Sequence, residues 1–526
     1  MEALPSATSF MAAALAVTVL AFLWKAVVVL LLTPWRLERS LRGEGLNGSP
    51  YRLMVGDLLE MNRLKKEAQS DPMPEFSNNI VSRLLPFFQK SVEKYGNCCF
   101  RWVGPAPVLV VTDGILVREV LKRVYEFEKP DMRVNRNVLV SGLVLLEGHK
   151  WAKHRKILSP AFHLNKLKSV LAASIVSCAE LIHKWETLIS PEISCEVNVL
   201  TDMEILTGNI TARAAIGSSY EEGKAIFQLQ SEQVANVFKT LHLAFIPGYS
   251  FLPTKINRRM KQVDRQVRHL LKGVVDGRLK YLKNRGDGTE AAENLLDVLL
   301  ESNSREMEER GHEKGMNMKE VMDECKGIYL AGQETTASLL IWTLILLSKH
   351  LDWQSKAREE ILQVFGEDKE INFNGLFQLK TMNMILNEVL RLYPPATLIY
   401  RKVNKATKLG PYYLPAGVHI QVPILLIHHD RQLWGEDAQV FNPNRFSNGV
   451  SNAGTGKSPL PFLPFSSGVR VCIGRDFSSI ESKAVLAMIL RRFTVELSPS
   501  YRHSPSAMLS IRPQHGAPLI LRKLPG

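Results

Sequence analysis

Cysteine is scarce in this chain, with only six residues among 526 and no regular spacing between them. That count excludes a disulfide-built scaffold and suits a reducing compartment. The sequence also lacks internal repeats, low-complexity tracts, zinc-finger spacing and an arginine-rich tail. Nucleic acid is therefore not an expected partner. The formal net charge of +14 instead favours anionic lipid headgroups or an acidic protein.

Motifs that bind nucleotides or flavins are also missing from the sequence. Residues 286–291 (GDGTEA) imitate a dinucleotide fingerprint, but they follow a basic helical stretch and not a strand. Residues 456–458 (GKS) resemble the end of a phosphate-binding loop, but Ser451 occupies the first glycine position and Pro459 follows. We expect loops at both places, so the electrons for any redox reaction must come from another protein.

One long hydrophobic run is present, over residues 10–32, and it is interrupted only by Thr18 and Lys25. About 20 apolar residues span a bilayer as a helix, and the long Lys25 side chain can reach the lipid interface. The alternative is a cleaved signal peptide, which needs a basic N-terminal region. Because residues 1–9 contain Glu2 and no basic residue, we expect a retained transmembrane helix.

The chain is expected to have three parts: an N-terminal membrane anchor over residues 1–33, a Pro/Gly hinge linker over 34–50 and one large domain over 51–526. A tryptophan and three arginines follow the hydrophobic run, and the positive-inside rule places the large domain on the cytoplasmic side. The next most apolar segment, residues 328–347, carries Gln333, Glu334 and three threonines, so we expect it to be a buried helix.

The remaining sequence predicts a mainly α fold with small β-sheets. Apolar residues recur at helical spacing in residues 80–95, 166–188, 263–282, 318–347, 353–365, 381–392 and 480–493. Short runs rich in β-branched and apolar residues predict strands at residues 108–112, 418–422 and 519–521. Residues 441–465 are rich in Gly, Pro, Asn and Ser, which indicates an irregular segment.

The most informative local motif is residues 465–474 (FSSGVRVCIG), which run into a predicted helix near Phe477. A thiolate that binds a metal needs positive charge around its sulfur, and the N–H groups of a glycine-containing loop and a helix N-terminus supply it. Gly468 and Gly474 allow the close backbone approach, and Arg470 offers a cation to a carboxylate. The alternative is a buried cysteine beside a helix start. The segment resembles the haem-binding loop of the cytochrome P450 family, whose iron has a cysteine ligand.

This resemblance implies a cytochrome P450 fold, a single large catalytic domain and haem b (iron protoporphyrin IX) as the cofactor. It identifies Cys472 as the iron ligand, with Phe465 and Gly474 beside the haem. It also implies NADPH–cytochrome P450 reductase as the electron donor, because the chain has no nucleotide or flavin site of its own. With its anchor, the protein is expected to be a single-pass protein of the endoplasmic reticulum membrane, with the catalytic domain facing the cytosol.

A second motif, residues 331–336 (AGQETT), lies within the apolar segment 328–347. Gly and consecutive threonines are poor helix formers, so helix propensity does not explain them. Taken alone, the motif is more typical of a core helix than of a site. The resemblance implies a widened helix turn at Ala331 and Gly332, where O2 binds over the iron. It assigns Thr335 a hydrogen bond to bound oxygen, and Glu334 a proton relay from solvent.

Several arginines match the family's haem-propionate contacts, which suit a planar guanidinium because it binds a carboxylate at two points. Trp151 and Arg155 stand four residues apart on one helix face, as in the family's Trp-x-x-x-Arg helix. Arg401 and Arg470 match its other propionate-contacting arginines. Each arginine taken singly is more typical of a solvated surface, so the prediction depends on their joint spacing.

Three charged residues are expected to have a structural role and not a catalytic one. Glu388 and Arg391 stand three residues apart and share a helix face. Arg445 belongs to a Phe-x-Pro-x-Arg-Phe segment that joins this pair in the family. The resemblance therefore implies a buried ion-pair network that fixes the region leading to the cysteine loop.

Departures from the family pattern are few. Ser466 and Val469 replace a usual Gly and Pro in the loop, Ser478 replaces a common Ala, and Asn444 replaces a common Glu. None of them removes a predicted ligand, but they leave the redox potential and the packing around the haem open.

The leading hypothesis is a monooxygenase, in which R–H, O2, two electrons and two protons give R–OH and water. A haem-thiolate isomerase or dehydratase typically lacks the acid–threonine pair, whereas Glu334 and Thr335 are both present here. A membrane-anchored haem carrier or sensor, the non-enzymatic alternative, would not need a proton relay.

The substrate is predicted from a weaker similarity. The sequence looks most like the plant non-A-type clan that includes brassinosteroid-inactivating, cytokinin and gibberellin hydroxylases, in segments such as residues 390–395 (LRLYPP), 428–430 (HHD) and 497–501 (LSPSY). The resemblance places small or apolar residues on the pocket wall, at Ala331, Ala396, Thr397, Leu398, Ala507 and Met508. Such a wall suits a steroid or terpenoid hormone, and a specialised terpenoid or a fatty acid is the alternative.

Overall fold

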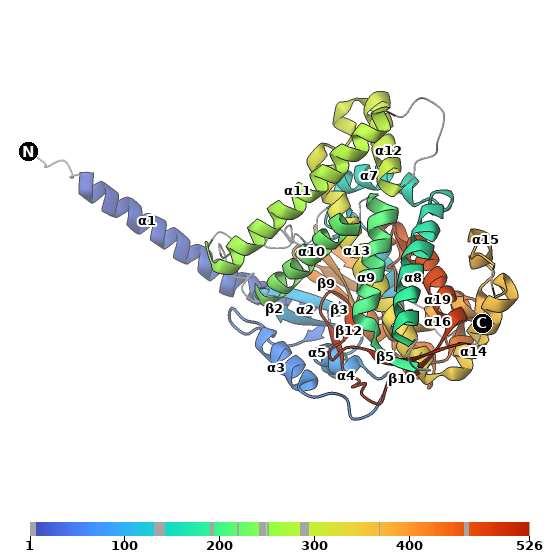
Figure 1. Cartoon of the computed structure of the whole chain (residues 1–526). Coiled ribbons are helices and arrows are strands. Elements are labelled where there is room, and N and C mark those ends of the chain that lie inside the picture. Colours follow the sequence, from blue (N-terminus) through green and yellow to red (C-terminus); the bar gives the residue numbers. More distant parts are fainter. Residues whose placement is uncertain are drawn as a thin grey trace, which may run out of the picture.

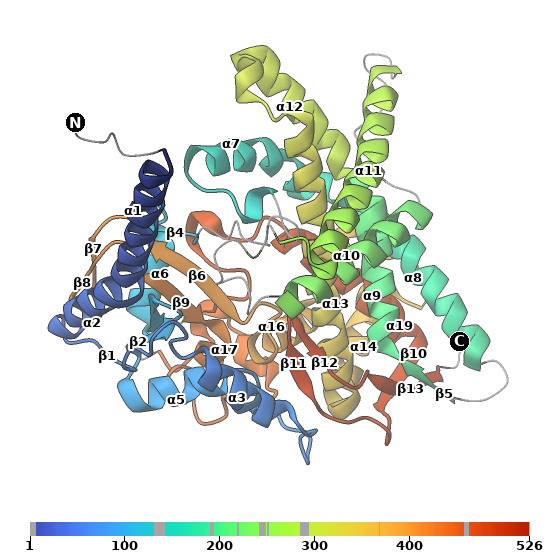
Figure 2. The ribbon, with the colours of Figure 1, turned by 90° about the vertical axis from the view of Figure 1, so that its left-hand side faces the viewer.

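A computed structural model of the chain describes residues 7–130, 142–189, 194–217, 220–240, 249, 252–284, 294–367, 369–456 and 462–524. Figures 1 and 2 show a helix-rich body from which helix α1 (Ala7–Val27) projects on one side. A sheet-rich part lies near the base of α1, and most of the long helices lie on the other side of the body (Figure 2). The prediction of a mainly α fold with small β-sheets is confirmed.

Helices make up most of the described residues. The first group is α1, α2 (Thr33–Gly43), α3 (Leu58–Gln69), α4 (Val81–Leu84), α5 (Pro86–Tyr95), α6 (Gly114–Lys122), α7 (Gly148–Leu158) and α8 (Lys168–Ile189). The second is α9 (Val199–Thr211), α10 (Tyr220–Thr240), α11 (Lys255–Asn284), α12 (Leu295–Arg310) and α13 (Met318–Lys349). The third is α14 (Leu351–Phe365), α15 (Phe373–Leu376), α16 (Lys380–Leu392), α17 (Ile424–His428), α18 (Arg431–Trp434) and α19 (Arg475–Arg492).

The strands form one larger sheet and three small ones. The six-stranded sheet has the order β1-β2-β3-β9-β6-β4, from β1 (Asn47–Gly48), β2 (Cys98–Val103), β3 (Ala106–Val111), β9 (His419–Pro423), β6 (Leu398–Val403) and β4 (Phe127–Glu128). A three-stranded sheet has the order β10-β13-β5, from β10 (Phe493–Leu497), β13 (Pro518–Lys523) and β5 (Ser194–Asn198). The two hairpins pair β7 (Thr407–Leu409) with β8 (Tyr412–Leu414), and β11 (Pro505–Ala507) with β12 (Ile511–Pro513).

Helix α13 forms much of the core of the body. A capping box fixes its start, because the Asn317 side chain accepts from the Glu320 N–H and the Glu320 carboxylate accepts from the Asn317 N–H. Every residue from Thr336 to Ser348 is buried, and the helix packs against α9, α16 and α19. The predicted buried helix is therefore present, and its apolar composition reflects burial within the protein.

Two segments of the described residues are long and apolar enough to cross a membrane: Ala14–Gly43 and Met318–Lys349. The most apolar window of the second is 83% buried inside the body, whereas that of the first is not buried at all. The N-terminal helix is therefore a candidate membrane anchor. It continues through a π-helical turn (Val28–Leu32) into α2, so the residues expected to form a hinge linker, 34–50, are mostly helical. The three-part division of the chain stays a prediction.

Other differences from the predicted elements have local causes. The helix expected over residues 80–95 is split into α4 and α5, because Leu85 leaves the helical region (φ −130°) and Pro86 starts the next helix. The helix expected near Phe477 begins two residues earlier, at Arg475. Helices α9, α10 and α12 were not predicted. The two segments that resemble nucleotide-binding motifs lie almost wholly outside the described residues, because only Gly456 among residues 286–291 and 456–458 is described.

The predicted structural ion-pair network is present. Glu388 and Arg391 are fully buried and form a two-point pair, with both N–O distances at 2.7 Å. Arg445 approaches the same carboxylate at 3.8 Å and pairs with Asp437 at 2.7 Å. Arg391 also donates to the carbonyl oxygen of His428 at 2.8 Å. The network therefore ties α16 to the segment that leads towards the cysteine loop.

Candidate active site

Backbone hydrogen bonds and left-handed residues hold the Cys472 loop in shape. The Cys472 N–H donates to the Phe465 carbonyl oxygen at 2.9 Å. Gly468 has φ 70°, and a Cβ at this position would lie 2.8 Å from the Leu121 carbonyl oxygen, so a side chain would clash with the backbone of α6. Helix α19 begins at Arg475. Cys472 therefore lies just before a helix N-terminus, as its motif predicts.

The Cys472 sulfur lies at the wall of an internal cavity. Burial in the protein raises the pKa of its thiol, while the Gly474 N–H and the guanidinium groups of Arg155 and Arg475 act in the opposite direction. A bound metal ion selects the thiolate form. Among the residues that the structure describes, no group of three or more His, Cys, Asp or Glu side chains could hold a metal. Within these residues, Cys472 is thus a single candidate ligand and not part of such a cluster.

Helix α13 contributes another wall of this cavity, with Ala331, Gly332 and Thr335. A Cβ at Gly332 would lie 3.1 Å from the Thr211 hydroxyl oxygen on α9, so the two helices pack closely here. The Thr335 hydroxyl donates to the Ala331 carbonyl oxygen at 2.7 Å. Helix α13 is α-helical throughout its length, so the widened turn implied by the resemblance is not seen. The Thr335 hydroxyl therefore lies at the cavity wall and is hydrogen-bonded within its own helix.

Cationic side chains surround one part of the cavity. Arg470 stacks on the Trp151 ring at 4.0 Å and forms an ion pair with Glu147. Arg155 donates to the Val471 carbonyl oxygen at 3.1 Å, which holds it beside the cysteine loop. Since Glu147 neutralises only one of these arginines, the cluster retains a net positive charge that suits an anionic group.

Lys129 belongs to the same cluster, although no sequence motif marks it. It lines the cavity and donates to the Val144 carbonyl oxygen at 2.6 Å. Burial, followed by the charges of Arg470 and Arg401, lowers the pKa of Lys129 to about 7. A nearby anion would favour its protonated form. Arg401 itself is buried and does not line the cavity; its guanidinium donates to the Tyr400 carbonyl oxygen at 2.8 Å.

Glu334 lies behind the wall that α13 forms, and not on it. The carboxylate is buried, accepts a hydrogen bond from the Ser510 hydroxyl at 2.7 Å and pairs with Arg512 on β12. Arg512 also pairs with Glu204 on α9. Neighbouring residues of one helix point about 100° apart, which explains why Thr335 reaches the cavity and Glu334 does not.

The structure brings most of the predicted site together. Nine of the eleven predicted site residues line the cavity: Trp151, Arg155, Ala331, Gly332, Thr335, Phe465, Arg470, Cys472 and Gly474. The other two, Glu334 and Arg401, lie behind it. Of the predicted pocket-wall residues, Ala331 and Ala396 line the cavity, but Thr397, Leu398, Ala507 and Met508 do not. Met508 is 52% exposed, because it lies in the turn between β11 and β12.

The donor set fits a flat, largely apolar cofactor with an anionic edge. Cys472 offers one soft ligand, small residues of α13 leave room beside it, and apolar side chains such as Leu339, Ile424 and Phe477 line much of the rest. The cations around Lys129 and Arg155 suit carboxylates. This combination is that of a haem-thiolate protein.

Known proteins share this combination of fold and sequence. The family described as Cytochrome P450 matches residues 72–517 of the chain. The chain is 46% identical over 502 residues to Cytochrome P450 72A397 from Kalopanax septemlobus, with 95% of each chain covered. It is 45% identical over 504 residues to Cytochrome P450 72A15 from Arabidopsis thaliana, with 96% of each covered. The solved structure of retinoic acid bound cyanobacterial CYP120A1 superposes with a TM-score of 0.74 at 20% identity, covering 91% of this chain and 99% of that one.

The chain therefore belongs to the cytochrome P450 family. It is a cytochrome P450 monooxygenase of the CYP72 family, to which the two plant relatives belong. Membership implies a haem-thiolate cofactor, O2, a redox partner and a lipophilic substrate. The solved structure, at its low identity, shows the shared fold alone.

Proposed function

We propose that this monooxygenase carries haem b and hydroxylates a lipophilic steroid or terpenoid, with a brassinosteroid-like plant hormone as the first candidate. Its electrons come from NADPH through NADPH–cytochrome P450 reductase. Helix α1 anchors it in the endoplasmic reticulum membrane, with the catalytic domain facing the cytosol. The observation that carries the proposal is the single cavity that Cys472, Thr335 and a largely apolar lining share.

In this proposal the polar residues of the site comprise an iron ligand, a cation cluster and a proton-handling pair, of which only Thr335 lines the cavity. Cys472 binds the iron, and Arg155, Arg470 and Lys129 hold the anionic edge of the cofactor. The bound haem supplies the activation of O2. Thr335 holds a hydroxyl proton at the cavity wall.

Glu334 is the proposed source of protons for Thr335. Its carboxylate is buried behind α13 and is held by Arg512 and Ser510. Side-chain rotation away from Arg512 would be needed to bring it towards Thr335. We therefore assign Arg512 a positioning role, in which it holds the Glu334 carboxylate on the far side of α13 until the side chain rotates.

The lining of the cavity supports a hydrocarbon-rich substrate. Most lining residues are apolar, and they include Leu143, Phe162, Ile328, Leu339 and Ile399. The carboxylate of Glu324 also lines the cavity, but His154 Nδ1 contacts it at 2.5 Å and the Leu143 N–H donates to it at 2.9 Å. A wall with few free hydrogen-bonding groups suits a fused-ring skeleton that carries few hydroxyls.

A substrate screen tests the proposed activity. Purified full-length protein, its reductase and NADPH are incubated under 18O2 with separate panels of steroid hormones, other terpenoids and fatty acids. We expect one 18O atom in a product from the steroid or terpenoid panels. Label in fatty acids alone would overturn the substrate class, and haem binding without an O2-dependent product from any panel would favour a carrier or sensor.

The electron donor is expected to dock beside the cysteine loop. Helix α6 contacts this loop at Gly468, and its exposed face carries Arg118 and Lys122, four residues apart. These cations suit an acidic partner surface. Substituting both with Glu should lower the reductase-supported rate severalfold while leaving reduction by dithionite unchanged. Lys280→Glu with Lys283→Glu, at the far end of α11, is the matched control.

Membrane placement has its own test. A glycosylation acceptor added before α1 should be modified in microsomes, whereas an acceptor in the exposed residues of α12 should not. Modification at α12 would contradict a cytosolic catalytic domain.

A further inference from the structure

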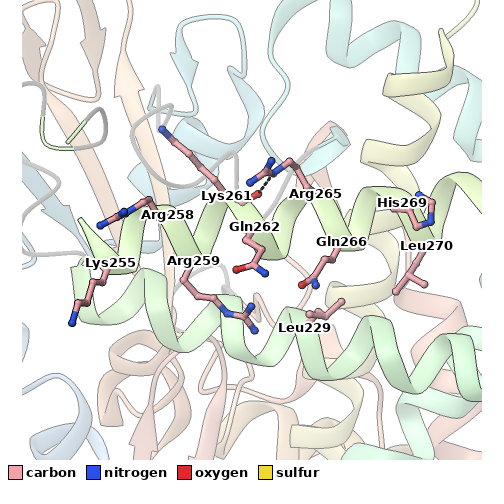
Figure 3. Close-up of a pocket in the computed structure, with 10 residues that line it drawn as sticks. All are labelled: Leu229, Lys255, Arg258, Arg259, Lys261, Gln262, Arg265, Gln266, His269 and Leu270. Carbon is pink, nitrogen blue, oxygen red and sulfur yellow. Dashed lines mark hydrogen bonds between the residues drawn. The ribbon is translucent and has the colours of Figure 1, made fainter. Parts of the chain in front are cut away.

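An open groove runs along the first half of α11 (Figure 3). Five of its ten lining residues are Lys or Arg, and none is Asp or Glu: Lys255, Arg258, Arg259, Lys261 and Arg265. With a helical rise of about 1.5 Å per residue, they extend over roughly 15 Å. Together these five side chains make the first half of α11 strongly positive, and we call them the α11 row.

Two carboxylates that lie near the row leave most of its charge uncompensated. Asp264 turns to the inner side of α11, where it pairs with Lys326 at 2.6 Å and with Arg268 at 3.0 Å. Glu232 on α10 pairs with Arg259 at 2.6 Å. The other cations of the groove form no ion pair within the described part of the chain: Lys255, Arg258, Lys261 and Arg265. In Figure 3, Lys261 and Arg265 project on the side of α11 away from α10. Their charge is thus free for an external anion.

The row begins on the side of the body from which the candidate anchor projects. Figure 1 shows the N-terminal end of α11 on the same side as the base of α1, and Figure 2 shows both facing the viewer. The Tyr51 hydroxyl donates to the Leu30 carbonyl oxygen at 2.8 Å, which fixes the segment after β1 to the anchor. Exposed apolar side chains lie in that segment and just before α11, at Leu53, Met54, Leu59 and Leu252.

We propose that the α11 row binds the phosphate-bearing headgroups of anionic phospholipids in the leaflet that α1 enters. This proposal rests on the anchoring part of the proposed function. Exposed apolar side chains and a row of cations on the same side of the body match a membrane interface, where the former enter the acyl boundary and the latter meet the headgroups. The base of the candidate anchor lies on this side of the body, which favours a membrane over an acidic protein. The bound lipid would hold α10 and α11 at the membrane surface and fix the tilt of the body.

The test measures lipid selectivity of the full-length holoenzyme. Protein in neutral detergent is mixed with equal amounts of phosphatidylserine and phosphatidylcholine, and retained lipids are counted by native mass spectrometry. We expect phosphatidylserine to be preferred. The triple substitution Arg258→Gln, Lys261→Gln and Arg265→Gln should lower that preference by about 10- to 100-fold, since each basic residue at an anionic surface strengthens association severalfold.

Matched removal of three charges from the same helix provides the control. Lys272→Gln, Lys280→Gln and Lys283→Gln lie towards the end of α11 that points away from the anchor, and they should leave the preference unchanged. An intact carbon monoxide difference spectrum verifies that each variant is folded. The preference should also weaken as salt is raised, because screening reduces the attraction.

Three results would overturn the proposal. The first is an unchanged preference in the triple variant, and the second is an equal loss in the control. The third is a weaker affinity for the reductase in phosphatidylcholine nanodiscs with the lipid preference intact, which would assign the row to a protein partner. Extraction at alkaline pH tests the anchor separately: a protein that is extracted lacks the anchor, whatever its lipid preference.

Discussion

Arg512 on β12 forms an ion pair with Glu334 on α13, and the same guanidinium pairs with Glu204 on α9. The acidic residue of the acid–threonine motif is therefore held on the far side of its helix from the cavity. The next residue, Thr335, lines the cavity itself. A proton that reaches Thr335 from Glu334 must therefore come from the side of α13 opposite the cavity, where the Arg512 side chain is partly exposed.

This relationship makes Glu334→Gln informative. The substitution removes the ionisable group but keeps its size and its contact with Ser510. Because general acid–base groups contribute about 10²- to 10⁴-fold, we expect kcat to fall by roughly 100-fold, with more NADPH diverted to peroxide and a larger solvent isotope effect. Glu204→Gln keeps the Glu334–Arg512 pair and should change kcat less than about threefold. Equal effects of the two substitutions would remove Glu334 from the proton path.

Cys472→Ser tests the ligand assignment. The serine hydroxyl is a poor donor to haem iron, so the reduced protein with carbon monoxide should lose the absorption band typical of a thiolate ligand. Cys98→Ser is the control, because Cys98 lies in β2 and outside the cavity lining. Persistence of the thiolate band in the Cys472 variant would show that another residue binds the iron.

The loop around Cys472 could be predicted from sequence because its chemistry is local. Glycines, a cysteine and a helix start within ten residues leave little freedom, and the structure places Phe465, Arg470, Cys472 and Gly474 on one cavity wall. The core position of α13 followed from its length and composition in the same way. Helix faces could also be predicted where two charges share a turn, as for Glu388 and Arg391.

The rest of the site depends on long-range packing. The residue that holds the Glu334 carboxylate, Arg512, lies 178 residues away in sequence. Lys129 directly follows β4, and no local pattern marks it as part of the cation cluster. Met508 was expected on the pocket wall, but the β11–β12 turn exposes it to solvent. These outcomes depend on how distant segments meet, which residue spacing does not determine.

Ser466 is strained, and its substitution should stabilise the protein. It has φ 61°, a left-handed conformation that costs an L-residue about 1–2 kcal/mol. Glycine has no such cost, but its greater conformational freedom in the unfolded chain lowers the free energy of unfolding by about 0.5–1 kcal/mol. We therefore expect Ser466→Gly to raise the free energy of unfolding by about 0.5–1 kcal/mol, measured by denaturant titration of the holoenzyme.

The neighbouring serine is a control of opposite sign. Ser467 has an extended backbone (φ −151°), which any residue adopts readily. Ser467→Gly therefore relieves no strain and adds only unfolded-state entropy, so it should lower the free energy of unfolding. Stabilisation by both substitutions, or by neither, would show that the backbone of Ser466 is not strained in solution.

Glu481 on α19 predicts a pH-dependent stability. It is fully buried, and burial raises its pKa well above the usual range, while the Thr336 hydroxyl acts in the opposite direction. No ion pair to Glu481 is found within the described residues. The folded protein therefore holds a proton here at pH values where the unfolded chain, with a pKa of about 4.3, has lost it. The free energy of unfolding must therefore fall as pH rises above the pKa of Glu481 in the unfolded chain, and it stops falling above the pKa of Glu481 in the folded protein.

Glu481→Gln removes this slope, because glutamine resembles the protonated acid and does not titrate. The variant should match the wild type near pH 4.5 and become more stable than it as pH rises to 8, in thermal unfolding followed by circular dichroism. Glu309→Gln, at an exposed position of α12, should show no such divergence. If the gap between the Glu481 variant and the wild type stayed constant with pH, the buried carboxyl would already be charged in the folded protein.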